Sequence, residues 1–263
     1  MARGLQRPSG GLAPHFARCR MTRVLPQEVP VAIVFNGTTQ AVMMATPDKL
    51  DAFGIGFALT EGTVTRGDEI ETLEVIRHAK GYEVRMWVSD AAADRMAERR
   101  RSMMGPVGCG LCGIDSLDQA VRDVPRVISD FAMTTEQVRA ATADLRNHQP
   151  LHDQTRAVHG AAFWQGDIIA ACEDVGRHNA LDKLIGTLMQ RGIDPEQGAI
   201  VLTSRVSIDM VQKVAILGAP ILIAVSAPTA QAIEIADKSN LTVAALSRGD
   251  HFETFTHPER IRP

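Results

Sequence analysis

The sequence predicts an α/β protein: a three-layer α/β/α domain in the second half of the chain, preceded by a smaller α+β domain. Two short apolar segments, 199–203 and 220–226, are separated by an amphipathic helical pattern, which is typical of parallel strands covered by helices on both faces. The first half instead pairs strands around turns and carries separate helices. We therefore divide the chain into a disordered tail (1–27), an α+β domain (28–133) and an α/β/α domain (134–263).

The composition argues against several classes of protein. The 263 residues suffice for one large or two modest domains, and 45% hydrophobic with 22% charged residues is an ordinary globular balance. A net charge of −3 argues against electrostatic binding of nucleic acid, and no apolar run approaches the roughly 20 residues that span a bilayer. Of the four cysteines, Cys19 and Cys172 are isolated, which fits a reducing cytoplasm better than a disulfide framework. We therefore expect a cytoplasmic protein that binds neither nucleic acid nor membrane.

The first 27 residues are rich in arginine and contain no acidic residue, and prolines and glycines interrupt any helix. Such a segment can be a transit peptide, but unordered termini are commoner, and we predict a disordered tail. Patterned sequence begins just after Met21, so we hypothesise that Met21 is the native start.

Turn and cap signals place the elements of the first half. Asn36-Gly37 lies between two apolar segments and predicts a hairpin, and Lys80-Gly81 predicts a second turn. Pro47-Asp48 opens one helix and Ser89-Asp90 caps another. The expected strands are 31–35, 40–45, 70–76 and 82–88, and the expected helices are 47–61, 89–101 and a short one from Asp115 or Ser116.

Helical and apolar spacing place the elements of the second half. Residues 181–188 carry leucine and isoleucine at i, i+3, i+4 and i+7, the buried face of a helix that follows Gly176. In the helix 207–217 we expect Asp209 and Lys213 to point outward as an i, i+4 pair. The other expected helices are 136–147, capped by Thr134 or Thr135, and 229–238; the expected strands are 158–164, 167–172, 199–203, 220–226 and, as the last strand, 241–246.

Cys109 and Cys112 form a CxxC motif in a glycine-rich loop. Two thiols at this spacing can share a metal, form a disulfide or pass sulfur between them. The chain has no second CxxC, so a four-cysteine zinc site cannot form within one chain, and thiol chemistry is favoured. Cys112 lies near the next helix start, where the helix dipole would stabilise a thiolate, and Cys109 is better placed to reach another protein.

Four arginines, Arg95, Arg99, Arg100 and Arg101, precede the CxxC loop. They can form a solvated surface, or they can lower the pKa of the thiols and receive an acidic partner protein. The sequence favours neither interpretation.

Three strand-to-helix turns in the second half are candidates for binding an anion. Ligands bind at the carboxyl ends of parallel strands, and free N–H groups at helix starts attract anions. Arg177, Arg205 and Lys213 would add positive charge. The candidate residues are Arg177, His178, Ser204, Arg205 and Ser226. The serines can also be simple helix caps, and neither a P-loop nor a GxGxxG motif is present. His159, inside an apolar strand, is interpreted as a core residue.

Several long motifs together resemble the formate dehydrogenase accessory sulfurtransferase (FdhD) family. They are Gly108–Gly113, Glu173–Gly186, Ser204–Lys213, Pro220–Thr229 and Ser247–Gly249. The similarity extends from about Val31 to Ile261 and is far more specific than a CxxC motif alone.

The resemblance implies a carrier of persulfide sulfur. A cysteine desulfurase would load the CxxC motif, with Cys109 as the persulfide and Cys112 as its partner. The sulfur would pass to the molybdenum or tungsten of a bis(pterin guanine dinucleotide) cofactor of formate dehydrogenase. The family's cofactor-binding segment falls on Leu246, Ser247, Arg248, Gly249, Asp250 and His251. The family usually has an aromatic residue in place of Leu246 and a basic or amide residue later in the segment.

The resemblance also implies a fold similar to that of cytidine deaminases, and a homodimer. Deaminase chemistry is not expected, because His159-Gly160-Ala161 lacks the glutamate of the zinc deaminase motif. Two alternatives to a sulfur carrier stay open. One is a chaperone that binds the cofactor without transferring sulfur, and the other is a zinc-binding interaction module whose CxxC is completed across a dimer.

Overall fold

The structure is a computed structural model that describes residues 24–103 and 124–263; from 98 to 103 it describes the backbone alone. In these ranges, no helix has both the length and the apolar character needed to cross a membrane. Most of the tail predicted for 1–27 lies outside the described residues. The short helix predicted from Asp115 or Ser116 lies outside them entirely.

Two hairpins build a four-stranded sheet in the first half of the chain. Its strands are β1 (Val29–Phe35), β2 (Thr38–Ala45), β3 (Ile70–His78) and β4 (Gly81–Val88), in the order β2-β1-β4-β3. The hairpins are antiparallel, and β1 pairs with β4 in parallel. Asn36 and Gly37 have φ angles of 47° and 77°, as a two-residue hairpin turn requires. With the helices α1 (Leu50–Thr60) and α2 (Asp90–Met103), the elements predicted for the described part of this half are confirmed.

A six-stranded sheet forms the centre of the second half. Its strands are β6 (His159–Trp164), β7 (Ile168–Asp174), β8 (Ala199–Leu202), β9 (Ile221–Ala224), β10 (Thr242–Arg248) and β11 (His251–Thr256), in the order β11-β10-β9-β8-β6-β7. Within this sheet only β8, β9 and β10 pair with one another in parallel. The prediction of a parallel sheet is therefore wrong towards the two edges of the sheet, where the strands of the hairpins β6–β7 and β10–β11 are antiparallel.

The end of the chain contains strands that the sequence analysis missed. The strand predicted as the last is β10, but β11 follows it, and β12 (Ile261–Arg262) then pairs with β5 (Met133–Thr134). β11 lies at the sheet edge and most of its residues are exposed or half-buried, so its sequence lacks an apolar run. The structure also adds 3₁₀ turns at Gly67–Glu69, Leu145–His148, Pro195–Gln197 and Pro258–Arg260.

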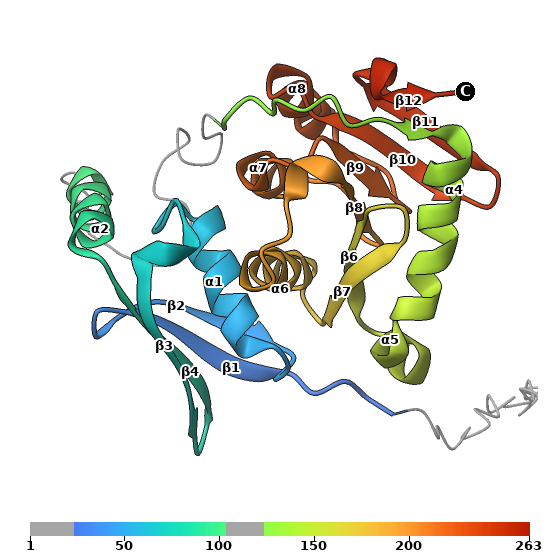
Figure 1. Cartoon of the computed structure of the whole chain (residues 1–263). Helices are drawn as coiled ribbons and strands as arrows, with labels where there is room; N and C mark the ends of the chain where they lie inside the picture. Colours follow the sequence, from blue (N-terminus) through green and yellow to red (C-terminus); the bar gives the residue numbers. More distant parts are fainter. Residues whose placement is uncertain (1–23, 104–123) are drawn as a thin grey trace, which may run out of the picture.

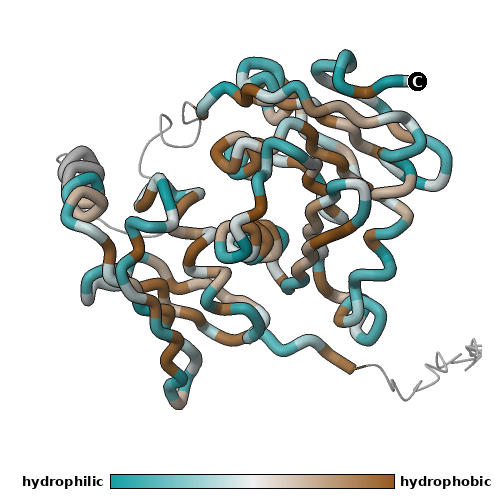
Figure 2. Tube along the Cα trace, in the orientation of Figure 1, coloured by the Kyte–Doolittle hydropathy of each residue, from teal (hydrophilic) through white to brown (hydrophobic). Residues whose placement is uncertain are grey.

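Helices cover both faces of the six-stranded sheet, which confirms the three-layer α/β/α prediction. α4 (Thr135–Asp144) and α5 (Pro150–Thr155) cover one face, and α6 (Arg177–Gln190), α7 (Ile208–Leu217) and α8 (Ala230–Lys238) the other (Figure 1). Alternate residues of one strand join different cores: Ala162 packs with α4, whereas Phe163 packs with α6. Figure 2 shows apolar residues concentrated in the central strands and in α6.

Helices α1 and α6 cross between the two sheets with their backbones in close contact (Figure 1). A Cβ atom added to Gly56 would lie 1.8 Å from the carbonyl oxygen of Asp182, and one added to Gly186 would lie 1.9 Å from that of Ala52. Both positions therefore require glycine. The close contact makes one continuous core, which contains Phe53 of α1 and residues of both sheets.

The boundary predicted at residue 133 separates the strands of the two sheets but does not interrupt this core. Residues before it already lie along the second half: the N–H of Val127 donates to the carbonyl oxygen of Ser239 at 2.8 Å, and Nδ2 of Asn240 donates to that of Val127 at 2.7 Å. The division into domains stays a prediction.

Two consecutive residues of α6, one acidic and one basic, each form a buried ion pair with a residue of another element. The Lys183 ammonium lies 2.7 Å from a carboxylate oxygen of Asp174, and both side chains are fully buried. This ammonium also donates to the carbonyl oxygen of Thr46, whose own N–H donates to the Asp174 carboxylate. The pair therefore connects α6 to the end of β7 and to the chain that follows β2.

Asp182 forms the second pair, with Lys213 of α7 at 2.8 Å. Thr60 at the end of α1 donates to the same carboxylate at 2.9 Å and accepts from Lys213 at 2.7 Å. Burial raises the pKa of the Asp182 carboxyl group, although Lys213 acts in the opposite direction. The prediction that Lys213 points outward is wrong, because it is buried against this carboxylate, and it is not available to bind a ligand.

We expect Gly186→Ala to destabilise the protein by about 1–3 kcal/mol or more, because the new methyl group would separate the backbones of α1 and α6. Unfolding in urea measures the change. Gly67→Ala is the matched control, since its Cβ atom would contact only the flexible end of Met189, at 3.2 Å. Equal stability of the two variants would contradict the close packing.

We expect Lys213→Met to lower the free energy of unfolding by about 3–5 kcal/mol at about pH 8, because it leaves the Asp182 carboxylate buried without its cation. The pKa of Asp182, already raised, would rise further. A buried acid with a raised pKa binds a proton more readily in the native than in the unfolded state, so the loss should shrink as pH falls towards about 5.

Urea unfolding at both pH values measures the loss, with Lys238→Met, an exposed residue of α8, as the control. A loss that does not change with pH would exclude Asp182 as its cause.

Candidate functional site

The residues predicted to bind an anion lie along one edge of the six-stranded sheet. Strands β7, β8, β9 and β10 run in the same direction, so their carboxyl ends meet there. Ser204 follows β8, Ser226 follows β9, and Arg177 begins the helix after β7. The structure thus brings the three turns together, as the rule for strand ends predicts.

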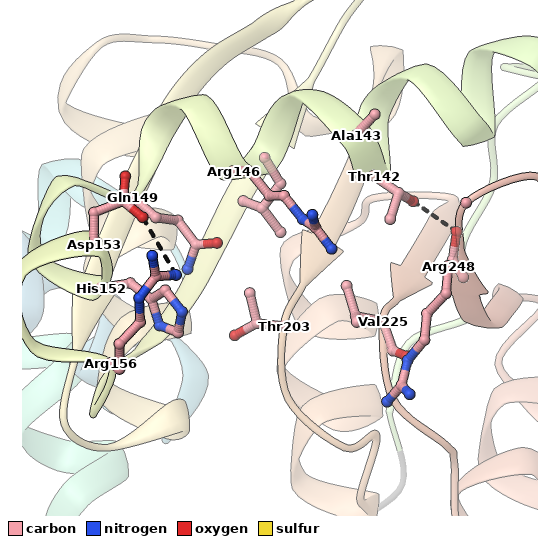
Figure 3. A pocket seen from close by; sticks show the side chains of 13 residues that line it. Thr142, Ala143, Arg146, Gln149, His152, Asp153, Arg156, Thr203, Val225 and Arg248 are labelled. Carbon is pink, nitrogen blue, oxygen red and sulfur yellow. Dashed lines mark hydrogen bonds and ion pairs between the residues drawn. The ribbon is translucent and has the colours of Figure 1, made fainter.

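A pocket of about 680 Å³ opens at this edge, between the strand ends and the α4–α5 segment (Figure 3). One wall consists of Thr142, Ala143, Leu145, Arg146, Gln149, His152, Asp153 and Arg156, and the other of Thr203, Val225, Ser247, Arg248 and Gly249. Gln149, His152 and Arg156 lie at one end, Thr142 and Arg248 lie at the other, and Arg146 lies between them (Figure 3).

Three residues of the predicted segment 246–251 line this pocket: Ser247, Arg248 and Gly249. Gly249 has a φ of 58° in the turn between β10 and β11, a conformation that glycine adopts without strain. The buried hydroxyl of Ser247 lies 2.7 Å from that of Thr142, which joins the two walls. Leu246, Asp250 and His251 are not among the lining residues.

The remaining predicted residues do not line this pocket: Arg177 and His178 begin α6, Ser204 and Arg205 precede α7, and Ser226 lies between β9 and α8. Ser207, at the start of α7, does not cap its helix, and its hydroxyl is buried with no partner among the described residues. The serine and threonine residues at these turns are therefore not all caps, although Thr229 does cap α8.

Positive groups surround His159 at the same edge. Burial lowers the pKa of His159, and the charges of Arg177, His152 and His178 lower it further. His159 is half-buried, so its interpretation as an ordinary core residue is incomplete. His178 lies 3.6 Å from Asp209 and lowers the pKa of that carboxyl group. Arg177, which carries a fixed positive charge, is thus a group at this edge that favours an anion outside the pocket.

Two arginines of the pocket have no carboxylate partner in the described part of the chain. The guanidinium of Arg156 forms an ion pair with Asp153 at 3.5 Å, but Arg146 and Arg248 form none. Arginine recognises phosphate and carboxylate groups through its planar set of N–H donors. The pocket is thus suited to a ligand that carries phosphate or carboxylate groups.

The sequence analysis missed Arg146, Gln149, His152 and Arg156. They lie in the 3₁₀ turn after α4 and in or beside the short helix α5, which no motif marks. A run of basic and amide side chains between a helix and a strand was the only available signal, and only the sheet order places that run opposite Arg248.

Cys109 and Cys112 lie outside the described residues, so their predicted roles stay predictions. The helix that precedes them, α2, is attached to the first half by Arg95, which donates to Glu69 at 2.7 Å. The backbone N–H of Thr65 and the Arg95 side chain lower the pKa of Glu69 to about 2. Arg95 therefore has a structural partner, whereas the side chains of Arg99, Arg100 and Arg101 lie outside the described residues.

Comparisons with known proteins agree on one family. The model of the FdhD/NarQ family matches residues 26–262. The chain is 50% identical over 242 residues to the "Sulfur carrier protein FdhD" of Agrobacterium fabrum, covering 91% of this chain and 89% of the relative. It is 46% identical over 238 residues to the protein of the same name from Bordetella bronchiseptica, covering 89% and 86%.

A solved structure shares the fold. It is a crystal structure from Desulfotalea psychrophila, provisionally described as a formate dehydrogenase accessory protein. The TM-score is 0.70 at 27% sequence identity, and the match covers 90% of both chains. With a family match over nearly the whole chain and relatives of this similarity, the chain belongs to the FdhD/NarQ family.

Proposed function

We propose that this protein is a sulfur carrier that receives persulfide sulfur from a cysteine desulfurase and delivers it to the bis(pterin guanine dinucleotide) cofactor of a formate dehydrogenase. The observation that carries the proposal is the pocket at the sheet edge, where Arg146 and Arg248 have no carboxylate partner in the described ranges and residues of the predicted cofactor segment form part of one wall. The names of the relatives support sulfur transfer, and the name of the solved structure supports the link to formate dehydrogenase.

The loading step is an exchange between thiols. The Cys109 thiolate attacks the outer sulfur of the desulfurase persulfide; a new S–S bond forms on Cys109, the old one breaks, and the desulfurase cysteine leaves as a thiolate. For delivery, the Cys112 thiolate attacks Sγ of Cys109, which forms a disulfide and releases the outer sulfur as sulfide. The two thiols supply the electrons, and a cellular dithiol reductant restores them.

The metal cofactor is the substrate in this scheme. Its guanine nucleotide ends carry phosphates, for which Arg146 and Arg248 are suitable donors. The charge of Arg177, which acts on His159, extends the attraction for phosphate beyond the pocket. The same proposal includes a contact of the remaining residues of the segment 246–251 with the cofactor. It also includes molybdenum or tungsten as the metal, a homodimer and a cytoplasmic location.

We expect Cys109→Ala to abolish sulfur loading, because it removes the attacking thiolate. After incubation with a cysteine desulfurase and cysteine, intact mass measurement of the wild type should show an adduct of about 32 Da, the mass of one sulfur atom. Cys172→Ala is the control, since this cysteine is buried and should not affect loading.

A wild type without the adduct would refute the carrier role. Normal activation of the dehydrogenase by a Cys109→Ala/Cys112→Ala variant would favour the cofactor chaperone, which requires the pocket but no thiol.

We expect Arg248→Gln to weaken the binding of GDP about tenfold, since it removes one charge-assisted contact with phosphate. Calorimetric titration of the full chain measures the affinity, and the wild-type affinity should fall with added salt. Arg77→Gln, on exposed β3, is the matched control. Equal affinities for the two variants would show that the pocket is not the phosphate site.

A further inference from the structure

Gln149 is a buried side chain of the pocket whose polar end lacks a partner. The residue is 5% exposed, and its Nε2 atom is buried without a hydrogen-bond partner among the described residues. Gln149 lines the pocket, and its amide group is directed into it (Figure 3). Buried amides are nearly always hydrogen-bonded, so one that faces a pocket indicates a partner among the molecules that enter the pocket, water or a ligand.

The position of Gln149 in the fold makes this lack of a partner unusual. It is the residue before the first turn of α5, where a polar side chain normally accepts from the free N–H groups of the helix. Here Glu173 of β7 accepts instead, from the N–H groups of Leu151 at 2.8 Å and His152 at 2.7 Å. The amide of Gln149 is therefore not needed for capping.

Gly160 of β6, which has no side chain, leaves room for the amide group of Gln149. A Cβ atom at Gly160 would lie 2.6 Å from Nε2 of Gln149, so any other residue would displace the side chain. Gly160 is buried in the strand, and its backbone pairs with Thr203 across the pocket floor: its N–H donates to the Thr203 hydroxyl at 2.9 Å. The amide is thus held between the backbone of β6 and the pocket.

The charges in the pocket indicate what the amide recognises. Arg248 lies at the end away from Gln149 and Arg146 lies between the two ends, and in the described ranges neither has a carboxylate partner; Arg156, at the Gln149 end, forms an exposed ion pair with Asp153 (Figure 3). Phosphates favour the unpaired arginines. An amide offers one carbonyl acceptor and one N–H donor on the same edge, which matches the carbonyl and N–H groups of a purine base such as guanine. Its end of the pocket therefore suits the uncharged part of a nucleotide.

We propose that Gln149 is a specificity-determining residue that hydrogen-bonds the base at the nucleotide end of the ligand, while Arg146 and Arg248 bind its phosphates. This inference rests on the proposed function, which supplies a ligand with guanine nucleotide ends. It adds the residue that distinguishes a nucleotide from a simple polyphosphate.

The test compares GDP with inorganic pyrophosphate on the full chain by calorimetric titration. Gln149→Leu should weaken GDP about tenfold and leave pyrophosphate within about twofold of the wild type, because only the base loses a hydrogen bond. Without ligand, the melting temperature of this variant should equal or exceed that of the wild type, since the amide lost no protein partner. Gln165→Leu, in the exposed β6–β7 turn, is the control, and Gln149→Met repeats the test if Gln149→Leu does not fold.

Three results would overturn the inference. They are unchanged GDP affinity in the variant, an equal loss of affinity for GDP and pyrophosphate, and a marked fall in the melting temperature, which would reveal a structural partner. A wild type that binds neither GDP nor pyrophosphate would overturn the proposed ligand and this inference together. A wild type that binds both, with no selective effect of Gln149→Leu, would leave the proposed function intact and refute the role of Gln149.

Discussion

The central constraint of this structure is that α6 contains a buried acidic residue followed directly by a buried basic residue, and each must form an ion pair. Asp182 requires the ammonium of Lys213 from α7, and Lys183 requires the carboxylate of Asp174 at the end of β7. Because these side chains are buried away from water, each charge would be strongly destabilising without its partner. Thr60 and Thr46 join these pairs through hydrogen bonds, so α1 and the end of the first hairpin take their positions from the same helix.

This arrangement explains why the candidate site lies where it does. Asp174 is the last residue of β7, and the pair that it forms fixes the carboxyl end of that strand relative to α6. Glu173, its neighbour, holds the start of α5 and so positions one wall of the pocket. The opposite wall follows from the parallel strands β8, β9 and β10, whose ends meet at one edge. The end of β7 thus takes part in a buried ion pair of the core and in one wall of the pocket.

Local signals in the sequence predicted most of the elements, and the family resemblance pointed to Ser247, Arg248 and Gly249 of the pocket, but no signal marked the opposite wall. Asn36-Gly37 gives a hairpin and Thr134 caps α4, because turns and caps depend on a few neighbouring residues. Lys213 was misplaced, because an i, i+4 pair looks the same whether it faces solvent or a buried carboxylate on another helix. Arg146 and Gln149 were missed because only the order of the strands brings them opposite Arg248.

The hydrogen bond between Thr142 and Ser247 holds the two walls of the pocket together at one end. Because it ties α4 to β10, any widening there would break it. At the opposite end the wall is formed around α5, a helix of six residues whose first N–H groups donate to Glu173. Loss of the Glu173 carboxylate should therefore loosen this end of the pocket and leave the end tied by Thr142 and Ser247 in place.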